Sequence, residues 1–221
     1  MTRSIGDFPW FSALSGEQRQ RLDRQITRRS FQRGELVIGR GDPTRSVYLV
    51  ASGRILAVHW TEQGREIVYN SIGPGEVFGE LSAIAGLPRS LSLYAQSRSE
   101  LLELPGDVLT ELIDTAPSVR RAVLVGLVER IRELTERVHD LTSLSVQQRV
   151  RAHLLRLALE SQVFRAGGLL RDPPTHAEIG NSIGANREAV SRCLSDLARA
   201  GVLESGRKWI RLLRPDALLP D

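Results

Sequence analysis

The sequence predicts an α+β protein built from a rolled, jelly-roll-like antiparallel β-structure, one long helix, and a C-terminal winged helix-turn-helix. Three observations predict it. Short apolar runs separated by glycines fill residues 31–104, an apolar repeat follows residues 119–141, and two helix-start signals flank a glycine turn at Gly184. The parts expected from these patterns are residues 1–116, 117–141 and 142–221.

The N-terminal part opens with a short helical lead-in over residues 8–27, where Ser15 and Gln18 form a capping-box pattern. After about Phe31, strand-length runs alternate with turn signals, which predicts antiparallel strands closed into a roll. The expected strands are 35–38, 46–50, 55–60, 67–72, 90–96 and 101–104. Residues 107–116 are expected to form a short helix.

The long helix is predicted from apolar residues spaced 3, 4, 3, 4 and 3 apart, with charged residues on its other faces. This spacing is typical of the seam of a two-stranded coiled coil, so we expect a homodimer. The alternative is an ordinary amphipathic helix packed on a core, because about three heptads is a short repeat. The seam residues are Leu124, Leu127, Ile131, Leu134, Val138 and Leu141.

In the C-terminal part, Ser145 and Gln148 mark the start of one helix, and Thr175 and Glu178 mark the start of a second. The second helix is expected to stop near Gly184, and Asn186 is suited to cap a third that ends at Gly201. Residues 202–213 are expected to form a hairpin turning at Ser205-Gly206. Helix, glycine turn, helix and hairpin are typical of a winged helix-turn-helix.

Charge and composition restrict the classes of function that this chain can have. The net charge of +4 belongs to residues 142–221, which hold 12 basic against 8 acidic residues, and this indicates an anionic partner such as double-stranded DNA. A single cysteine, Cys193, excludes a cysteine-held zinc or iron–sulfur centre, and we expect no metal. No apolar run suits a signal peptide or a membrane span, so a cytoplasmic protein is expected. We find no catalytic constellation and expect no enzyme.

The third helix of the winged region separates its residue types by face. Val190, Leu194 and Leu197 fall on one face, and polar side chains that include Arg187 and Glu188 fall on the other. Arginine can bind guanine and glutamate can accept from cytosine in the major groove, so this face suits DNA reading. The alternative is a solvated helix face.

A second constellation lies in residues 78–90, where Glu80, Arg89 and Ser90 surround an expected short loop. A buried guanidinium with a hydroxyl and backbone N–H groups can hold a phosphate. The alternative is a plain Glu–Arg salt bridge.

With both constellations in view, the chain resembles the Crp/Fnr superfamily of bacterial transcription regulators along nearly its whole length, most of all the cyclic AMP receptor proteins. The matching stretches are Gly64-Arg65-Glu66, residues 75–81 (GEVFGEL), Pro88-Arg89-Ser90, Glu178-Ile179-Gly180, and residues 186–192 (NREAVSR).

The resemblance implies a cyclic-nucleotide-binding β-roll over 1–116, a dimerisation helix over 117–141 and a DNA-binding domain over 142–221. It implies that Glu80 binds the ribose hydroxyl, that Arg89 and Ser90 bind the cyclic phosphate, and that Arg130 approaches the pocket. The expected effector-site residues are Phe78, Gly79, Glu80, Leu81, Arg89, Ser90, Leu91, Arg130, Leu134 and Thr135. The effector expected first is cyclic AMP and next cyclic GMP; neither haem nor an iron–sulfur cluster is expected.

The resemblance also implies that a palindromic, TGTGA-like site is read and that RNA polymerase is a partner. The expected DNA-contacting residues are Thr175, His176, Asn186, Arg187, Glu188, Ser191 and Arg192.

Two departures from the family pattern affect the effector. Leu134 stands where family members carry a threonine that contacts adenine, and Leu91 stands where a small residue is usual. The alternatives are therefore a regulator that needs no nucleotide and, more remotely, a nucleotide-signalling module that acts through protein contacts.

Overall fold

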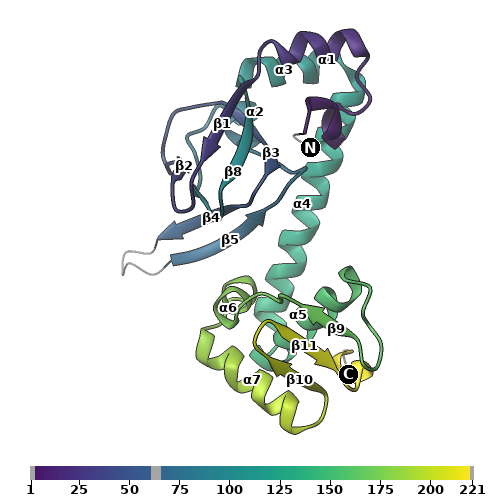
Figure 1. Cartoon of the computed structure of the whole chain (residues 1–221). Helices are drawn as coiled ribbons and strands as arrows, with labels where there is room; N and C mark the ends of the chain where they lie inside the picture. The colour runs from purple at the N-terminus through teal and green to yellow at the C-terminus, as the bar shows by residue number, and fades with distance from the viewer. Residues whose placement is uncertain (1–2, 61–65, 220–221) are drawn as a thin grey trace. The chain divides into compact units, whose positions relative to one another are not determined.

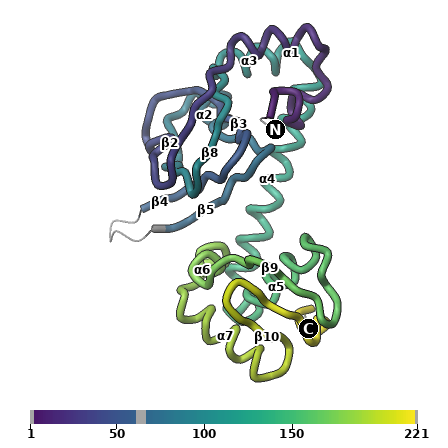
Figure 2. The backbone as a smooth tube through the Cα atoms, in the orientation of Figure 1, coloured from purple at the N-terminus to yellow at the C-terminus, as the bar shows by residue number. Residues whose placement is uncertain are grey.

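The computed structural model describes residues 3–60 and 66–219, which divide into two compact units, with the boundary between Arg130 and Ile131. Figure 1 labels the helices and strands, and Figure 2 traces the backbone through them. A single helix, α4 (Pro117–Ser143), contributes to both units. The predicted α+β class with antiparallel strands, a long helix and a helix-turn-helix is confirmed.

The N-terminal unit is built on antiparallel strands. It begins with two 3-10 turns, η1 (Ile5–Asp7) and η2 (Pro9–Phe11), and helix α1 (Gly16–Asp23). Its strands are β1 (Thr27–Phe31), β2 (Leu36–Ile38), β3 (Val47–Ser52), β4 (Ile55–Trp60), β5 (Glu66–Ile72), β6 (Val77–Phe78), β7 (Ser92–Ala95) and β8 (Ser99–Leu104). Helix α2 (Glu80–Ala85) follows β6, and α3 (Gly106–Thr115) follows β8.

The strands form two four-stranded sheets, in the orders β1-β8-β3-β6 and β2-β7-β4-β5. Strand β3 is buried on both faces: Val47 and Leu49 face a core shared with the helices, and Val50 faces a core between the sheets. Because side chains alternate along a strand, one continuous apolar run serves both cores. The first core also takes in Phe8, Phe11, Val119 and Val123, which fixes the start of α4 in this unit.

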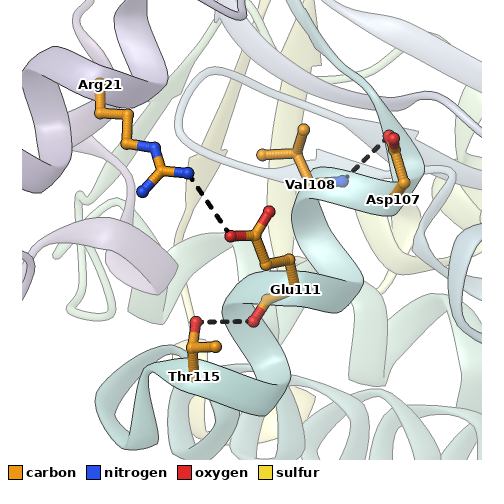
Figure 3. A network of polar contacts seen from close by, with 5 residues as sticks. All are labelled: Arg21, Asp107, Val108, Glu111 and Thr115. Atoms are coloured by element: carbon orange, nitrogen blue, oxygen red, sulfur yellow. Dashed lines mark hydrogen bonds and ion pairs between the residues drawn. The ribbon is translucent and has the colours of Figure 1, made fainter.

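One ion pair at the surface links helices α1 and α3, and Figure 3 shows it together with two hydrogen bonds inside α3. Arg21 forms a 3.7 Å ion pair with Glu111, and the Thr115 hydroxyl donates to the Glu111 carbonyl at 2.7 Å. The Asp107 carboxylate accepts from the Val108 amide at 3.0 Å within the first turn of α3. Exposed ion pairs of this kind add at most about 1 kcal/mol, so the apolar core carries the stability of this region.

The C-terminal unit is a winged helix-turn-helix. Its elements are the end of α4, then α5 (Val146–Glu160), β9 (Leu169–Arg171), α6 (His176–Ile183), α7 (Arg187–Arg199), β10 (Leu203–Gly206), β11 (Trp209–Leu212) and η3 (Pro215–Leu218). The three strands pair antiparallel in the order β10-β11-β9. The predicted inner face of α7 is confirmed, because Val190, Leu194 and Leu197 are buried in one core with Leu154 and Ile179.

Several local predictions were wrong. The hairpin turns at Arg207-Lys208 and not at Ser205-Gly206, which belong to β10; Gly206 pairs with Trp209, and Lys208 takes a left-handed φ of 67°. The expected loop after Phe78 contains helix α2. The lead-in over 8–27 is two separate pieces of helix, and strands β1, β6 and β9 were not foreseen.

Burial of His153 predicts a pH dependence of stability in this unit. Burial lowers the pKa of the His153 imidazole to about 4, helped by Arg156, and Nε2 has no hydrogen-bond partner among the described residues. An unfolded histidine titrates near pH 6.5, so between about pH 6.5 and 4 the unfolded chain binds the extra proton. Stability is therefore full above that window and is lost as the pH falls through it, by on the order of 2 kcal/mol.

Denaturant unfolding at pH 7.5 and 4.5, followed by fluorescence, measures this loss. His153→Leu should reduce it, whereas substitution of the exposed His139 by glutamine should leave it unchanged. An equal loss in wild type and His153→Leu would refute the assignment.

Candidate functional site

Arg89 is the buried arginine of the N-terminal unit, with only 4% of its surface exposed. Its guanidinium donates from Nη2 to the Ser46 carbonyl at 2.6 Å, from Nη1 to the Gly79 carbonyl at 2.9 Å, and from Nε to Thr44 Oγ1 at 3.2 Å. Three of its five N–H groups thus donate to protein oxygens, and two are left to donate to a ligand. A buried guanidinium with unused N–H groups can bind an anion by charge-assisted hydrogen bonds.

The turn at Gly79 gives this guanidinium its space. Gly79 has a φ of +88°, and a Cβ added there would lie 2.8 Å from both Arg89 Nη1 and the Ser46 carbonyl oxygen. Only glycine adopts this conformation without strain and lets the arginine approach the backbone. The chain turns at this point from β6 into α2, whose first residue is Glu80.

Glu80 is half-buried beside this arginine. Burial raises the pKa of its carboxyl above the ordinary value, and the positive charges of Arg130 and Arg89 oppose that shift. Arg89 and Arg130 are therefore both within electrostatic reach of Glu80. A carboxylate and two guanidiniums together can bind a ligand that has both hydroxyl and anionic groups.

The other expected effector-site residues differ in exposure. Phe78 is buried and stacks on Tyr48 with ring centroids 5.3 Å apart, and Leu91 is half-buried against the core between the sheets. Ser90 and Leu81 are exposed. Gly64 and Arg65 of the matching pattern lie outside the described residues.

Leu134 and Thr135 lie on α4 in the second compact unit, where Leu134 is 47% exposed and the Thr135 hydroxyl donates to the Ile131 carbonyl at 2.9 Å. Five of the six seam residues are exposed large apolar side chains: Leu124, Ile131, Leu134, Val138 and Leu141. The sixth, Leu127, packs partly against the N-terminal core. Exposed apolar stripes of this kind are typical of surfaces that contact other proteins, membranes or ligands.

The helix-turn-helix is fixed by the local signals predicted for it. Thr175 and Glu178 form a reciprocal capping box, and Asn186 Oδ1 accepts from the Ala189 amide at 2.8 Å. Gly184 ends α6 with a left-handed φ of 66°. A Cβ on Gly180 would lie 2.6 Å from the Ala185 carbonyl oxygen, so the turn closes tightly onto α6.

The outer face of α7 carries the expected polar residues. Arg187, Glu188 and Arg192 are exposed, and Ser191 is half-buried and hydrogen-bonded to His176. Helix N-termini and long polar side chains of this kind suit the major groove. Cys193, on the same helix, is a half-buried free thiol whose pKa is raised by burial.

The wing, which is the hairpin formed by β10 and β11, carries cationic side chains that the sequence motifs did not identify. A shallow hollow of about 440 Å³ is lined by Leu169, Arg171, Asp172, Lys208, Trp209 and Arg211. Arg211 lies 5.6 Å from the Trp209 ring centroid, and Lys208 pairs with Asp172 at 3.4 Å. Arg211 also pairs with Glu204 at 3.4 Å, so three cations face two carboxylates, and the net positive charge suits a phosphate backbone. The signal available in the sequence was the run of basic residues from Arg207 to Arg214.

In residues 3–60 and 66–219, no three histidine, cysteine or acidic side chains are grouped so that they could hold a metal ion. Among the helices described, none combines the length and apolar character needed to cross a bilayer.

Two family models match the chain. Residues 28–116 match the cyclic nucleotide-binding domain, and residues 148–220 match the Crp-like helix-turn-helix domain. The matched segments contain Arg89 and the α6–α7 pair respectively.

Curated relatives match over nearly the whole chain. A CRP-like cAMP-activated global transcriptional regulator from Mycobacterium tuberculosis is 31% identical, covering 90% of this chain and 87% of the relative. A cyclic AMP receptor protein from Thermus thermophilus is 32% identical, covering 96% and 95%. Among solved structures, the c-di-GMP responsive global regulator CLP from Xanthomonas campestris is similar, with a TM-score of 0.75, 27% identity, and coverage of 90% and 99%.

Proposed function

This chain belongs to the Crp/Fnr family of transcription regulators, and from that premise we propose that it is a homodimer gated by a cyclic nucleotide. The family comprises DNA-binding regulators and not enzymes, and this member has a cyclic nucleotide-binding domain. The single observation that supports gating best is the buried Arg89, which has two N–H groups to spare beside Glu80.

In the proposed complex, the free N–H groups of Arg89 and the exposed Ser90 hydroxyl bind the cyclic phosphate, and Glu80 accepts from the ribose 2′-hydroxyl. The first candidate effector is cyclic AMP, since the relatives from Mycobacterium tuberculosis and Thermus thermophilus are named for it, and cyclic GMP is the second. The similar regulator from Xanthomonas campestris is c-di-GMP responsive, which makes that cyclic dinucleotide a third candidate.

The output is binding to a palindromic, TGTGA-like DNA site in the cytoplasm, read by Arg187, Glu188 and Arg192. Reading such a palindrome requires the α7 helices of two copies, joined along the α4 stripe, to lie about 34 Å apart, one turn of DNA. RNA polymerase is the proposed further partner.

The proposed link between effector and DNA runs through the last seam residue. A Cβ added at Gly184 would lie 2.6 Å from Leu141 Cδ2, so the end of the seam packs directly on the helix-turn-helix turn. A nucleotide that favours one packing of the seam would shift the population of DNA-competent turns.

The second candidate is a regulator that is active without nucleotide, and Leu134 favours it. This apolar seam residue could hold the active packing by itself, and it has no hydroxyl to offer a base. A nucleotide-signalling module working only through protein contacts is the remote alternative, and the retained Arg187 and Glu188 count against it.

Calorimetric titration with cyclic AMP, cyclic GMP and c-di-GMP, paired with DNA-binding measurements in each state, tests the proposal. Micromolar binding of one nucleotide that also tightens DNA binding is the expected result. Tight DNA binding that none of the three nucleotides changes would favour the constitutive regulator.

Leu134→Thr is expected to increase the nucleotide response of DNA binding by about fivefold, since one added hydrogen bond is worth about 1 kcal/mol. The ratio of DNA affinities with and without nucleotide measures this response. Val125→Thr, at an exposed apolar position off the seam, is the matched control. Equal ratios in Leu134→Thr and wild type would contradict the role given to residue 134.

Removing a wing cation is expected to reduce the salt dependence of DNA binding. If Lys208 and Arg211 each neutralise one phosphate, Lys208→Ala or Arg211→Ala should lower the slope of log affinity against log salt by about 0.9. Fluorescence anisotropy over a salt series measures the slope. Arg98 is an exposed arginine of the N-terminal unit, and Arg98→Ala should leave the slope unchanged. An unchanged slope in the Lys208 and Arg211 variants would show that the wing does not contact the DNA.

A further inference from the structure

One hydrogen bond crosses between the two helices of the helix-turn-helix. His176 Nδ1, on the first residue of α6, lies 2.8 Å from Ser191 Oγ on α7. Both helix starts are held by capping bonds, from Thr175 for α6 and from Asn186 for α7. The capping bonds therefore fix the start of each helix that carries one member of the pair.

Ser191 lies on the outward face of α7. It follows the exposed Arg187 by four residues and precedes the exposed Ser195 by four, whereas the adjacent Val190 is fully buried. Residues four apart share a helix face, so Ser191 belongs to the surface that carries Arg187. On the proposed function, on which this inference rests, that surface faces the major groove.

The bond to His176 decides what Ser191 can offer a base. A serine hydroxyl ordinarily has one donor and two acceptor sites, so by itself it reads bases weakly. We infer that His176 is a positioning residue for base specificity, in the arrangement in which its Nδ1 accepts the hydrogen bond from the Ser191 hydroxyl. Oγ then presents only lone pairs to the groove.

An acceptor-only hydroxyl distinguishes the bases. In the major groove it can accept from the amino groups of adenine N6 and cytosine N4, whereas guanine and thymine present acceptors there. At the base facing Ser191, the wild-type protein should therefore prefer adenine or cytosine, by roughly three- to tenfold for one hydrogen bond. This preference is separate from the readings assigned to Arg187, Glu188 and Arg192.

Selection of binding sites from randomised duplexes tests the inference, using the full-length protein with and without cyclic AMP. Ser191→Ala should lose the base preference at one position of the selected site, and that position is the one that Ser191 faces. His176→Phe removes the acceptor, frees the hydroxyl to donate, and should let guanine and thymine rise at that position alone. His176→Asn, which can place Oδ1 near the site of Nδ1, should restore the preference.

A double-mutant cycle completes the test, because His176→Phe should change nothing at that position once Ser191 is alanine. If His176→Phe instead weakened all sequences equally, His176 would be only a phosphate contact and the inference would fall. A wild-type preference for guanine or thymine at this position would overturn it as well. Wild-type protein that selected no duplex would overturn the proposed function itself, and the inference with it.

Discussion

Arg89→Ala is expected to weaken cyclic-nucleotide binding by about 100-fold, since two charge-assisted hydrogen bonds to a phosphate are together worth roughly 3 kcal/mol. Arg89 is suited to this role because its position is set before any ligand arrives. Three donated hydrogen bonds fix the guanidinium, and the backbone of Arg89 is held by bonds to Gly41 and Asp42 at 2.8 and 3.0 Å. Calorimetric titration of the variant measures the loss.

The same contacts mean that Arg89→Ala also removes structural bonds, so a second variant is needed. Ser90 is exposed, and Ser90→Ala should lower nucleotide affinity by about fivefold without changing the unfolding midpoint. If both variants bound nucleotide as wild type does, while Arg89→Ala alone lost stability, Arg89 would be a purely structural arginine.

Arg187→Ala is expected to weaken binding to the palindromic site by 10- to 100-fold in each half-site, because a bidentate arginine–guanine contact is worth about 1–3 kcal/mol. Binding to unrelated DNA should change far less, since phosphate contacts dominate there. The two measurements together separate base reading from general charge attraction.

Arg199 offers a matched control on the same helix. It is exposed at the C-terminal end of α7 and is ion-paired with Asp196. Arg199→Ala removes the same charge and should leave the ratio of specific to nonspecific affinity unchanged. Equal losses in the two variants would show that α7 does not enter the groove by its N-terminal half.

Features determined by neighbouring residues could be predicted from sequence. The capping boxes at Ser15, Ser145 and Thr175, and the extent of α4, follow from side chains within one or two turns of each other. The inner face of α7 follows from helical periodicity in the same way.

Features determined by residues far apart in the chain could not be predicted from sequence. Strand β1, with the sequence TRRSF, is mostly exposed and has no apolar alternation; it is defined by its pairing with β8. The wing turn is displaced because the Trp209 ring covers Gly206, where a Cβ would lie 2.5 Å from the ring. Helix α2 has six residues, too few to show a period.

The proposed effector site likewise contains residues that could be predicted from sequence and residues that could not. Sequence reasoning identified Glu80, Arg89 and Ser90, and the structure adds the Thr44 and Ser46 oxygens, which lie more than forty positions away from Arg89. No pattern in the sequence marks those acceptors, because they become neighbours of Arg89 only through the pairing of strands.

The boundary between the two compact units falls inside α4, and this determines where the chain can be cut without unfolding the C-terminal unit. Leu141 lies against Gly184, and Arg137 donates to the Asn181 carbonyl at 3.4 Å, so the last turns of α4 are part of the fold that holds the helix-turn-helix. A proteolytic fragment that starts near Ile131 would keep these contacts and should remain folded. A fragment that starts at Leu144 would lose both, and the turn between α6 and α7 would become a site of further cleavage.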